Sequence, residues 1–392
     1  MSRASGATSR PHELSENASV FLDIVRFAAA IAVVASHSGE KFLGIGWRHE
    51  PLWGNLAVPL FFVLSGFVIR FVTRSREGNP RDYFIDRASR IYSVVLPAMG
   101  VTLLCSGLCL LLHRDRFLHD WSPFFTHPIG RLVLNLTFFS ESWGLNVSPF
   151  INSPFWSLSY ECLYYVFYGF VLFLRGWKRI VACAVFSLLM GPQVLFLLPL
   201  WWLGCWMYDA YHHVRGRRAS RIALATLAFW FAVSAFARFA DKGRMPFEPT
   251  AILSWIANLP NPLALLGQQI CRATMFSYAA AIGGSMLLFL SLLAVELIPA
   301  PRNAVWTQYV RRVADGTFVI YLFHLPLMLV LAYAGCFHRG HFAASIAVLI
   351  AMIVALIVLA GPLDALKRRM RRGLRAVVPD RAPALQLPLE SN

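Results

Sequence analysis

Apolar stretches recur along almost the whole chain, and ten of them are long enough, or nearly so, to cross a hydrocarbon core, which takes about 20 helical residues. Because a bilayer offers no water to unpaired backbone groups, segments that cross it fold as helices. The expected spans are 20–38, 53–72, 91–112, 156–175, 179–191, 194–211, 220–239, 274–295, 316–335 and 342–362. The sequence therefore predicts an all-α protein, a polytopic transmembrane helical bundle with about ten spans.

The distribution of charge predicts how such a bundle is oriented. The chain has 36 Lys and Arg against 20 Asp and Glu, a net charge of +16, and its charged residues stand mainly in short loops. With the amino terminus in the cytoplasm, 25 basic residues fall on the cytoplasmic side and 10 on the external side. The one remaining basic residue, Arg26, lies inside the first span. The positive-inside rule predicts that both termini are cytoplasmic, and it explains the basic charge without nucleic-acid binding.

Composition limits the domain organisation. Only 14% of the residues are charged and 57% are hydrophobic, whereas soluble domains carry about 25% charged residues. We expect one membrane domain at 20–362, a cytoplasmic tail at 1–19, and a basic, solvated cytoplasmic tail at 363–392, because no segment is long enough for a separate soluble core. A cleavable signal peptide is disfavoured, since Asp23 and Arg26 interrupt the first apolar stretch.

Two parts of the chain allow more than one interpretation. The stretches 179–191 and 194–211 are separated only by the tripeptide Gly-Pro-Gln, which favours a tight helical hairpin over one long kinked helix. The region 250–270 contains two prolines and is interpreted as a re-entrant or interfacial loop. Both assignments change the number of spans but not the class of fold.

Familiar chemical motifs are missing from the sequence. The seven cysteines lie in or beside apolar stretches without paired spacing, so we predict neither a disulfide framework nor a metal site. No phosphate-binding P-loop, dinucleotide fingerprint, HExxH or GxSxG pattern appears. Candidates for function are therefore sought among the ionisable residues inside the membrane spans, which are costly there and usually face a cavity.

The first span carries two such residues, Arg26 and His37. They are eleven residues apart, close to three helical turns, so both side chains project from one face, and Asp23 lies on that face one turn earlier. Their separation along the axis is about 16 Å, about half the hydrocarbon thickness. Arg26 is thus expected towards the cytoplasm and His37 near the external surface. Arg26 could instead be only a structural partner of Asp23.

A histidine suits general-base catalysis because its unperturbed pKa lies near neutrality, and a carboxylate can fix its tautomer. We expect Glu161, near the start of the fourth span, to orient His37, because that span runs inwards and places the two residues at a similar depth. Ser157 lies one turn before Glu161 on the same face, and Tyr165 and Tyr168 continue the stripe. The alternative is a helix start decorated with interfacial Trp, Ser and Tyr.

Two further segments hold secondary candidates. His324 lies in the middle of a span with Tyr321 one turn before it, and a structural histidine beside a proline kink explains it as well as a catalytic role does. Ser65 and Gly66 interrupt a bulky aromatic stretch, where small residues indicate that another helix packs closely.

The loop after the second span is strongly basic. It contains six arginines between positions 70 and 90, of which Arg81, Arg87 and Arg90 precede the third span. Topology alone explains such a run about as well as function does. The functional alternative is that arginines bind the phosphates of an acyl donor, because guanidinium groups grip phosphate oxygens in pairs. Arg87 and Arg90 are the best candidates.

Together these segments resemble membrane acyltransferase family 3, which includes bacterial O-antigen and Nod-factor O-acetyltransferases. The resemblance runs from about residue 20 to 362. It is carried by five segments in order: Arg26 with His37 ten residues between them, FFVLSGFVI at 61–69, the basic stretch 81–90, FWSLSYE at 155–161, and YLFHLP at 321–326. One departure is Ser93, which stands where the family often has a proline after the basic pair, and this puts the geometry of that loop in doubt.

The resemblance implies an acyl-CoA-dependent O-acyltransferase of a bacterial inner membrane. It would move an acyl group, often acetyl, from cytoplasmic acyl-CoA as co-substrate to a hydroxyl of a glycan, lipid-linked sugar or other acceptor, with no tightly bound cofactor. In the family the histidine and arginine of the first span are held to be essential, which maps onto His37 and Arg26, and the donor-binding residues map onto Arg81, Arg87 and Arg90. His37 would act as general base or as transient acyl carrier.

A transporter or flippase is the rival interpretation. The same intramembrane residues, among them Asp23, Glu161 and His324, could form a proton or substrate path. Transporters often contain internal repeats, and none is found in this sequence, which favours the enzyme.

Overall fold

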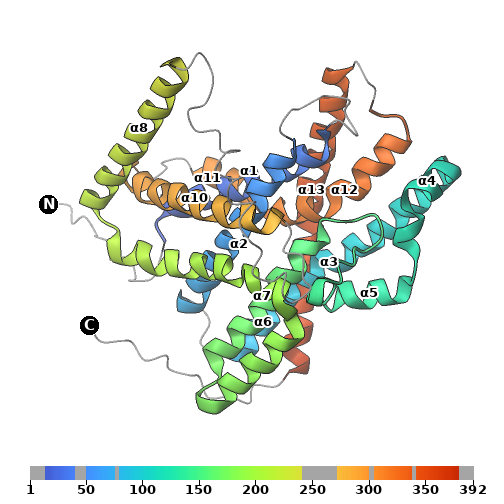
Figure 1. Ribbon diagram of the computed structural model, residues 1–392, viewed down its shortest axis with the longest axis horizontal. Helices are drawn as coiled ribbons and strands as arrows, with labels where there is room; N and C mark the ends of the chain where they lie inside the picture. The colour runs from blue at the N-terminus through green and yellow to red at the C-terminus, as the bar shows by residue number, and fades with distance from the viewer. Residues whose placement is uncertain are drawn as a thin grey trace.

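The computed structural model describes residues 14–39, 50–75, 79–240, 272–299, 304–337 and 341–378. These residues form helices joined by short loops, and no strand occurs among them (Figure 1). The predicted interfacial loop at 250–270 lies outside the described residues. The helices are α1 (Glu16–His37), α2 (Glu50–Ser75), α3 (Pro80–Leu112), α4 (Arg114–Trp121), α5 (Pro128–Leu136), α6 (Phe155–Phe173), α7 (Gly176–Val214), α8 (Arg217–Ala240), α10 (Arg272–Ala294), α11 (Ala304–Asp315), α12 (Thr317–Tyr333) and α13 (Phe342–Val377).

The helical bundle confirms the predicted all-α class. Within the described ranges six helices are long and apolar enough to cross a membrane, namely α1, α2, α3, α7, α10 and α13, and the pair α11 and α12, bent by 44° at Gly316, raises the number to seven. The helix α12 has only 17 residues, and α6 mixes Ser, Tyr and Glu into its 19 residues. Ten spans with both ends in the cytoplasm stay a prediction.

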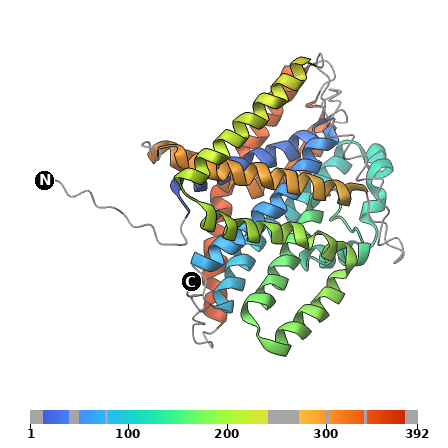
Figure 2. The same cartoon turned by 60° about the vertical axis from the view of Figure 1, so that its left-hand side comes forward.

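The two short stretches around residue 191 belong to one element. The helix α7 runs from Gly176 to Val214, and Gly191 breaks it with φ 77° and ψ 167°, a backbone conformation that favours glycine. Pro192 follows the break and cannot donate a backbone hydrogen bond. The stretches 179–191 and 194–211 thus lie on either side of a break in α7 at Gly191, and their assignment as two spans of a hairpin stays a prediction. In Figure 2, α6 pairs with the first part of α7 at the lower edge of the molecule.

The centre of the bundle is the crossing of α2 and α7. A Cβ atom on Gly66 would lie 1.9 Å from the backbone oxygen of Trp201, and one on Gly204 would lie 1.9 Å from the oxygen of Val63. Only glycine lets two helix backbones approach this closely. The expectation that small residues mark close packing near Gly66 is thus confirmed.

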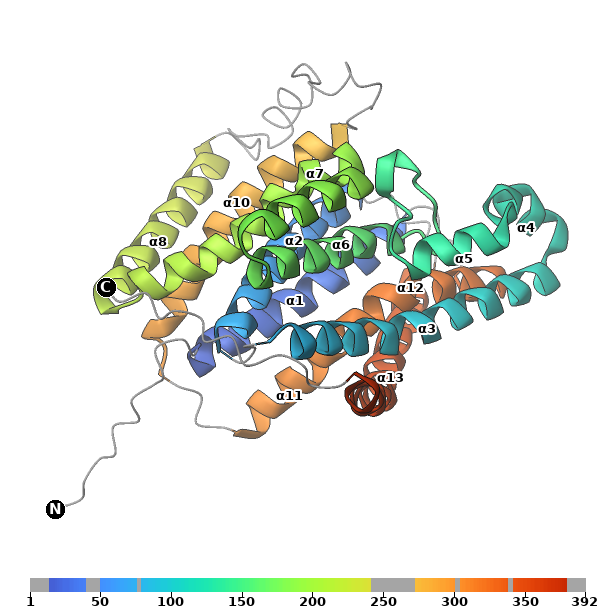
Figure 3. The same ribbon diagram turned by 90° about the horizontal axis from the view of Figure 1, so that it is seen from below.

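An ion pair strengthens the same interface. Arg70 of α2 binds both carboxylate oxygens of Asp209 of α7, with nitrogen to oxygen distances of 2.8 to 3.0 Å. It also donates to the hydroxyl of Tyr168 at 3.4 Å. A bidentate pair of this kind fixes the relative rotation of the two helices. Figure 3 shows α1 and α2 near the middle, between α8 and α10 on one side and α3 and α13 on the other.

The last helix continues far beyond its apolar part. We expected a solvated tail from residue 363, but α13 extends to Val377 and packs against the start of α3. Arg371 pairs with Asp86 at 2.5 Å, and Arg375 pairs with Asp82 at 2.8 Å. These pairs satisfy the basic residues of the helix within the protein, which explains why it stays ordered.

Candidate active site in the membrane cavity

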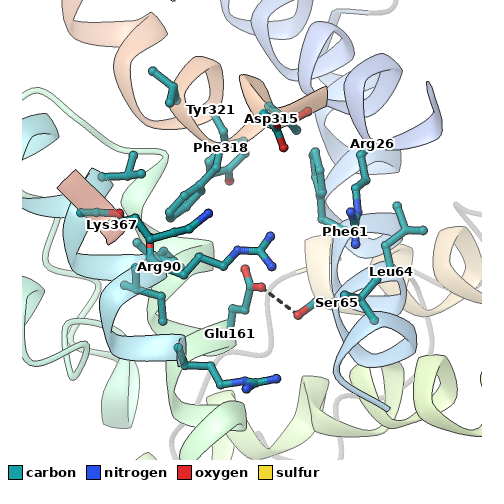
Figure 4. A pocket seen from close by; sticks show the side chains of 18 of the residues that line it. Arg26, Phe61, Leu64, Ser65, Arg90, Glu161, Asp315, Phe318, Tyr321 and Lys367 are labelled. Carbon is teal, nitrogen blue, oxygen red and sulfur yellow. Dashed lines mark hydrogen bonds between the residues drawn. The ribbon is translucent and has the colours of Figure 1, made fainter. Parts of the chain in front are cut away.

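A cavity of about 520 Å³ opens between α1, α2, α3, α6, α12 and α13 (Figure 4). Its floor and walls combine apolar side chains with an unusual number of ionisable ones. The polar residues that line it are Asp23, Arg26, Ser65, Asp86, Arg87, Ser89, Arg90, Ser93, Ser157, Glu161, Tyr165, Asp315, Thr317, Tyr321, Asp364, Lys367 and Arg371. Charged side chains inside a membrane bundle are expected to line such a cavity, and these do.

Arg26 enters the cavity from α1, beside Asp23. Their charged groups are 3.6 Å apart, and their side chains keep 25% and 19% of their surface exposed. This is a loose single contact rather than a bidentate pair, and Arg26 lines the cavity with most of its five N–H donors outside that contact. Arg26 is therefore available to a ligand even though it has Asp23 as a partner.

The three predicted donor-binding arginines separate into two groups. Arg90 projects into the cavity from α3 (Figure 4), and none of the described residues forms a hydrogen bond or ion pair with its guanidinium. Arg87 also lines the cavity, but it is buried against the ring of Tyr83, 4.2 Å from the centroid, and donates to the carbonyl of Tyr83 at 3.1 Å.

Arg81 lies outside the cavity lining. Its guanidinium donates to the carbonyls of Val378 and Arg375, both at 2.6 Å, and so binds the end of α13. Carbonyls at a helix C-terminus have no partner within the helix, and a cationic side chain satisfies them. The expectation that Arg81 lies with Arg87 and Arg90 at the donor site is therefore not met.

Glu161 faces the cavity from α6, but its partners differ from those expected. The hydroxyl of Ser65 donates to its carboxylate at 2.8 Å (Figure 4), and the hydroxyl of Tyr165 donates to the same oxygen. Ser65 in turn accepts a hydrogen bond from the indole of Trp201 at 3.1 Å. In the described chain no hydrogen bond joins Glu161 to His37. Glu161 ties α6 to α2, and its expected contact with the histidine is absent.

Ser157 and Tyr321 close one end of the cavity. Their hydroxyl oxygens are 2.5 Å apart, and they join α6 to α12. The ring of Phe61 packs edge-on against Tyr321, with centroids 5.7 Å apart. The predicted stripe of Ser157, Glu161 and Tyr165 is thus confirmed as a cavity wall, whereas Tyr168 points to Arg70 instead.

The two candidate histidines lie together behind this end. The ring centroids of His37 and His324 are 5.3 Å apart, and the ring of Tyr321 is 6.4 Å from that of His324. His324 is fully buried, whereas His37 is only partly covered at the end of α1. Neither histidine lines the cavity, whereas Tyr321, whose ring neighbours that of His324, does.

The helix that carries His324 is held by an unusual contact. Pro326 has no backbone N–H, so the carbonyl of Leu322 one turn earlier lacks its helical partner. The side-chain amide of Asn152 donates to that carbonyl at 2.9 Å and to Thr102 at the same distance. The loop before α6 therefore supports α12 at the point where the proline weakens it.

Several residues of the site were not found by sequence reasoning. Ser65 was interpreted only as a packing residue, and Asp315 stands at the end of an amphipathic helix that gave no membrane signal. Asp364 and Lys367 fell in the supposed tail, although Lys367 reaches the cavity from α13 (Figure 4). A signal was present in the spacing of Asp364, Lys367 and Arg371, which places them on one face of a continuing helix.

The apolar helices and the cavity between them, lined by both acidic and basic side chains and with the pair of His37 and His324 nearby, indicate a multi-pass membrane protein. Comparison with known families agrees. The acyltransferase domain of acyltransferase family 3 matches residues 19–362, and the chain belongs to this family. The predicted resemblance is confirmed.

The curated relatives share low sequence identity with this chain. The chain is 23% identical to the acyltransferase MdmB of Streptomyces mycarofaciens over 70% of this chain and 63% of that protein. It is 29% identical to the exopolysaccharide production protein ExoZ of Rhizobium meliloti (strain 1021) over 41% of this chain and 47% of that protein. It is 30% identical to protein 2 in the picA locus of Rhizobium radiobacter over 36% of this chain and 76% of that protein. The matches thus span less than two thirds of the first two relatives, and no solved structure matches significantly.

Proposed function

We propose that this protein is an integral membrane O-acyltransferase that moves an acyl group, acetyl in the simplest case, from cytoplasmic acyl-CoA to a hydroxyl of a glycan in a bacterial inner membrane. The observation that carries the proposal is the cavity. It is lined by several cations, including Arg90, whose guanidinium forms no hydrogen bond or ion pair with the described residues, and Tyr321 in its wall adjoins the histidine pair. Relatives named for acyl transfer and for exopolysaccharide production favour this class of substrates.

The donor end of the cavity fits a phosphate-rich ligand. Arg90 and Arg26 line it, Arg26 with a loose contact to Asp23, and Lys367, which pairs with Asp364 at 2.5 Å, adds a third cation from α13. Guanidinium groups bind phosphate oxygens strongly where water is partly excluded. The pantetheine arm of acyl-CoA would then extend between α2 and α6, where Ser65 and Glu161 offer polar groups, and its thioester would reach Ser157 and Tyr321.

The reaction moves one proton in two steps, by way of His37. His37 takes the proton of the acceptor hydroxyl, the oxygen bonds to the carbonyl carbon of the thioester, and the carbon–sulfur bond breaks. The proton then passes to the CoA thiolate, which leaves as the free thiol. For this to happen side chains at the cavity wall must shift so that the thioester and the acceptor reach His37, because neither histidine lines the cavity.

The test uses membrane vesicles from cells that express the chain, supplied with acetyl-CoA labelled in the acetyl group. We expect label in the polysaccharide fraction and release of free CoA thiol, and we expect both to be lost in His37→Ala while the amount of folded protein is unchanged. Uptake of label into the vesicle lumen without thiol release would indicate a transporter instead. Full transfer by His37→Ala would contradict the proposed chemistry.

A further inference from the structure

The imidazole of His324 has partners on one nitrogen only. Its Nδ1 lies 3.0 Å from the carbonyl oxygen of Ile320 and 2.9 Å from that of Tyr321. Carbonyl oxygens only accept hydrogen bonds, so Nδ1 carries the proton and donates it to them. In a neutral ring Nε2 is then unprotonated and can only accept. The backbone of α12 thereby fixes the tautomer of His324.

This free acceptor is buried. Nε2 of His324 has essentially no contact with solvent, and no described group forms a hydrogen bond with it. A buried acceptor without a donor costs about 1–3 kcal/mol, so a native protein rarely leaves one without a use. None of the acidic residues of the cavity contacts the ring, so a charged imidazolium at this position would also lack a partner.

The neighbour that can supply a donor is His37. Its ring lies 5.3 Å from that of His324 between centroids and is tilted by 39°. At this separation the facing ring edges come within hydrogen-bond reach after a modest rotation of one ring. His37 is at the end of α1 and only partly covered, so its side chain has the room to rotate, whereas His324 is packed on all sides.

We propose that His324, and not Glu161, is the positioning residue for His37 in the acyl transfer. The lone pair on Nε2 of His324 accepts the N–H of His37, which fixes the tautomer in which the other nitrogen of His37 is unprotonated and free to take the proton of the acceptor hydroxyl. When His37 becomes an imidazolium during transfer, the same lone pair stabilises it. His324 stays neutral throughout and keeps its own proton on the backbone carbonyls. The inference rests on the proposed function.

The surroundings of His324 suit a fixed acceptor. Asn152 holds the carbonyl of Leu322, and Ser157 holds the hydroxyl of Tyr321, so the turn of α12 just before His324 is tied to α6 and the loop before it. A positioning residue must be more rigid than the group that it orients, because the orientation is otherwise lost to side-chain motion.

The test compares two substitutions that separate positioning from packing. His324→Phe keeps the size and apolar contacts of the ring but removes the acceptor, whereas His324→Gln keeps an acceptor oxygen but packs less well. Met328→Leu, at a buried site one turn further along α12, is the matched control for disturbance of the helix core. The same vesicle assay with labelled acetyl-CoA gives kcat and the KM for acetyl-CoA, and thermal unfolding in detergent gives stability.

We expect His324→Phe to lower kcat by about 10–100-fold, as loss of an orienting hydrogen bond does elsewhere, with the KM for acetyl-CoA unchanged. His324→Gln should retain more kcat than His324→Phe even if it unfolds at a lower temperature. If His324 were purely structural, His324→Phe would keep more kcat than His324→Gln, and that result would overturn the inference. The proposed function would still stand in that case, because the wild type transfers the acyl group. A wild type that transfers no acyl group would overturn both.

Discussion

The hydroxyl groups of Ser157 and Tyr321 lie 2.5 Å apart and connect α6 with α12 where the cavity meets the histidine pair. Among the described residues Ser157 has one other partner, the carbonyl of Pro154 at 3.5 Å, so Tyr321 supplies its shorter hydrogen bond. The contact therefore ties this part of the cavity wall to the helix that bears His324.

Tyr321→Phe removes this hydrogen bond and leaves the ring in place. We expect the free energy of unfolding to fall by about 1 kcal/mol and acyl transfer to decrease, because the end of the cavity is no longer fixed. Thermal unfolding in detergent and the vesicle assay measure the two effects. Tyr309→Phe, on the exposed face of α11, is the control, and equal unfolding temperatures for the two variants would contradict the prediction.

Arg90→Ala tests the donor end of the cavity. We expect the KM for acetyl-CoA to rise about tenfold or more with little change in kcat, because a charge-assisted hydrogen bond to phosphate contributes about 1.5–3 kcal/mol to binding in the ground state and the transition state alike. Arg90→Lys should recover part of the affinity. Arg81→Ala is the matched comparison, since Arg81 binds the end of α13. The Arg81→Ala variant should unfold at a lower temperature and keep a KM near that of the wild type. If its KM changed as much as that of Arg90→Ala, this division of roles would be refuted.

Gly66→Ala tests the crossing of α2 and α7. The added carbon would stand 1.9 Å from a backbone oxygen that cannot turn away, so the helices must separate, and we expect a loss of about 3 kcal/mol or failure to accumulate. Gly100→Ala is the control, because nothing lies within 4 Å of a Cβ there and alanine favours the helix. Expression level and thermal unfolding compare the two, and equal behaviour would show that the crossing tolerates a methyl group.

Glu141 makes stability depend on pH. It lies in the loop between α5 and α6, is 4% exposed, and its burial raises the pKa from 4.5 to about 7. Between these two values the folded protein keeps a proton that the unfolded chain releases, so stability falls as pH rises through this window and stays lower above it.

Glu141→Gln should remove that fall. The variant is expected to be more stable than the wild type at pH 8, by on the order of 2–3 kcal/mol, and to approach it at pH 5. Thermal unfolding between pH 5 and 9 measures the difference. Curves that stay parallel over the whole range would show that the carboxyl does not gain its proton on folding.

Much of the fold follows from local pattern. Each predicted span lies within or overlaps a helix, because runs of apolar residues this long have no other way to satisfy their backbone in lipid. The end of α13 could not be predicted in the same way. Its last turns are stabilised by Asp82 and Asp86, which lie almost 300 positions earlier, and hydropathy does not report such pairs.

The sequence predicted which residues form the site better than it predicted the contacts between them. Spacing correctly placed Arg26, Ser157 and Glu161 on cavity-facing sides of their helices. It could not show that Ser65 takes the carboxylate of Glu161 or that His324 adjoins His37, because both contacts depend on how separate helices rotate against each other. Similar depth in the membrane was therefore not enough to identify the partner of His37.

The ordered end of α13 has a consequence for how the protein is made. This helix supplies Lys367 and Asp364 to the cavity and receives Arg81 at its end, and it is the last helix of the described chain to be synthesised. A nascent chain that still lacks it already contains both histidines but has one wall of the donor cavity open. The cavity is therefore completed only when translation of the described helices is almost finished, and a partly made chain cannot hold a ligand against all of its walls.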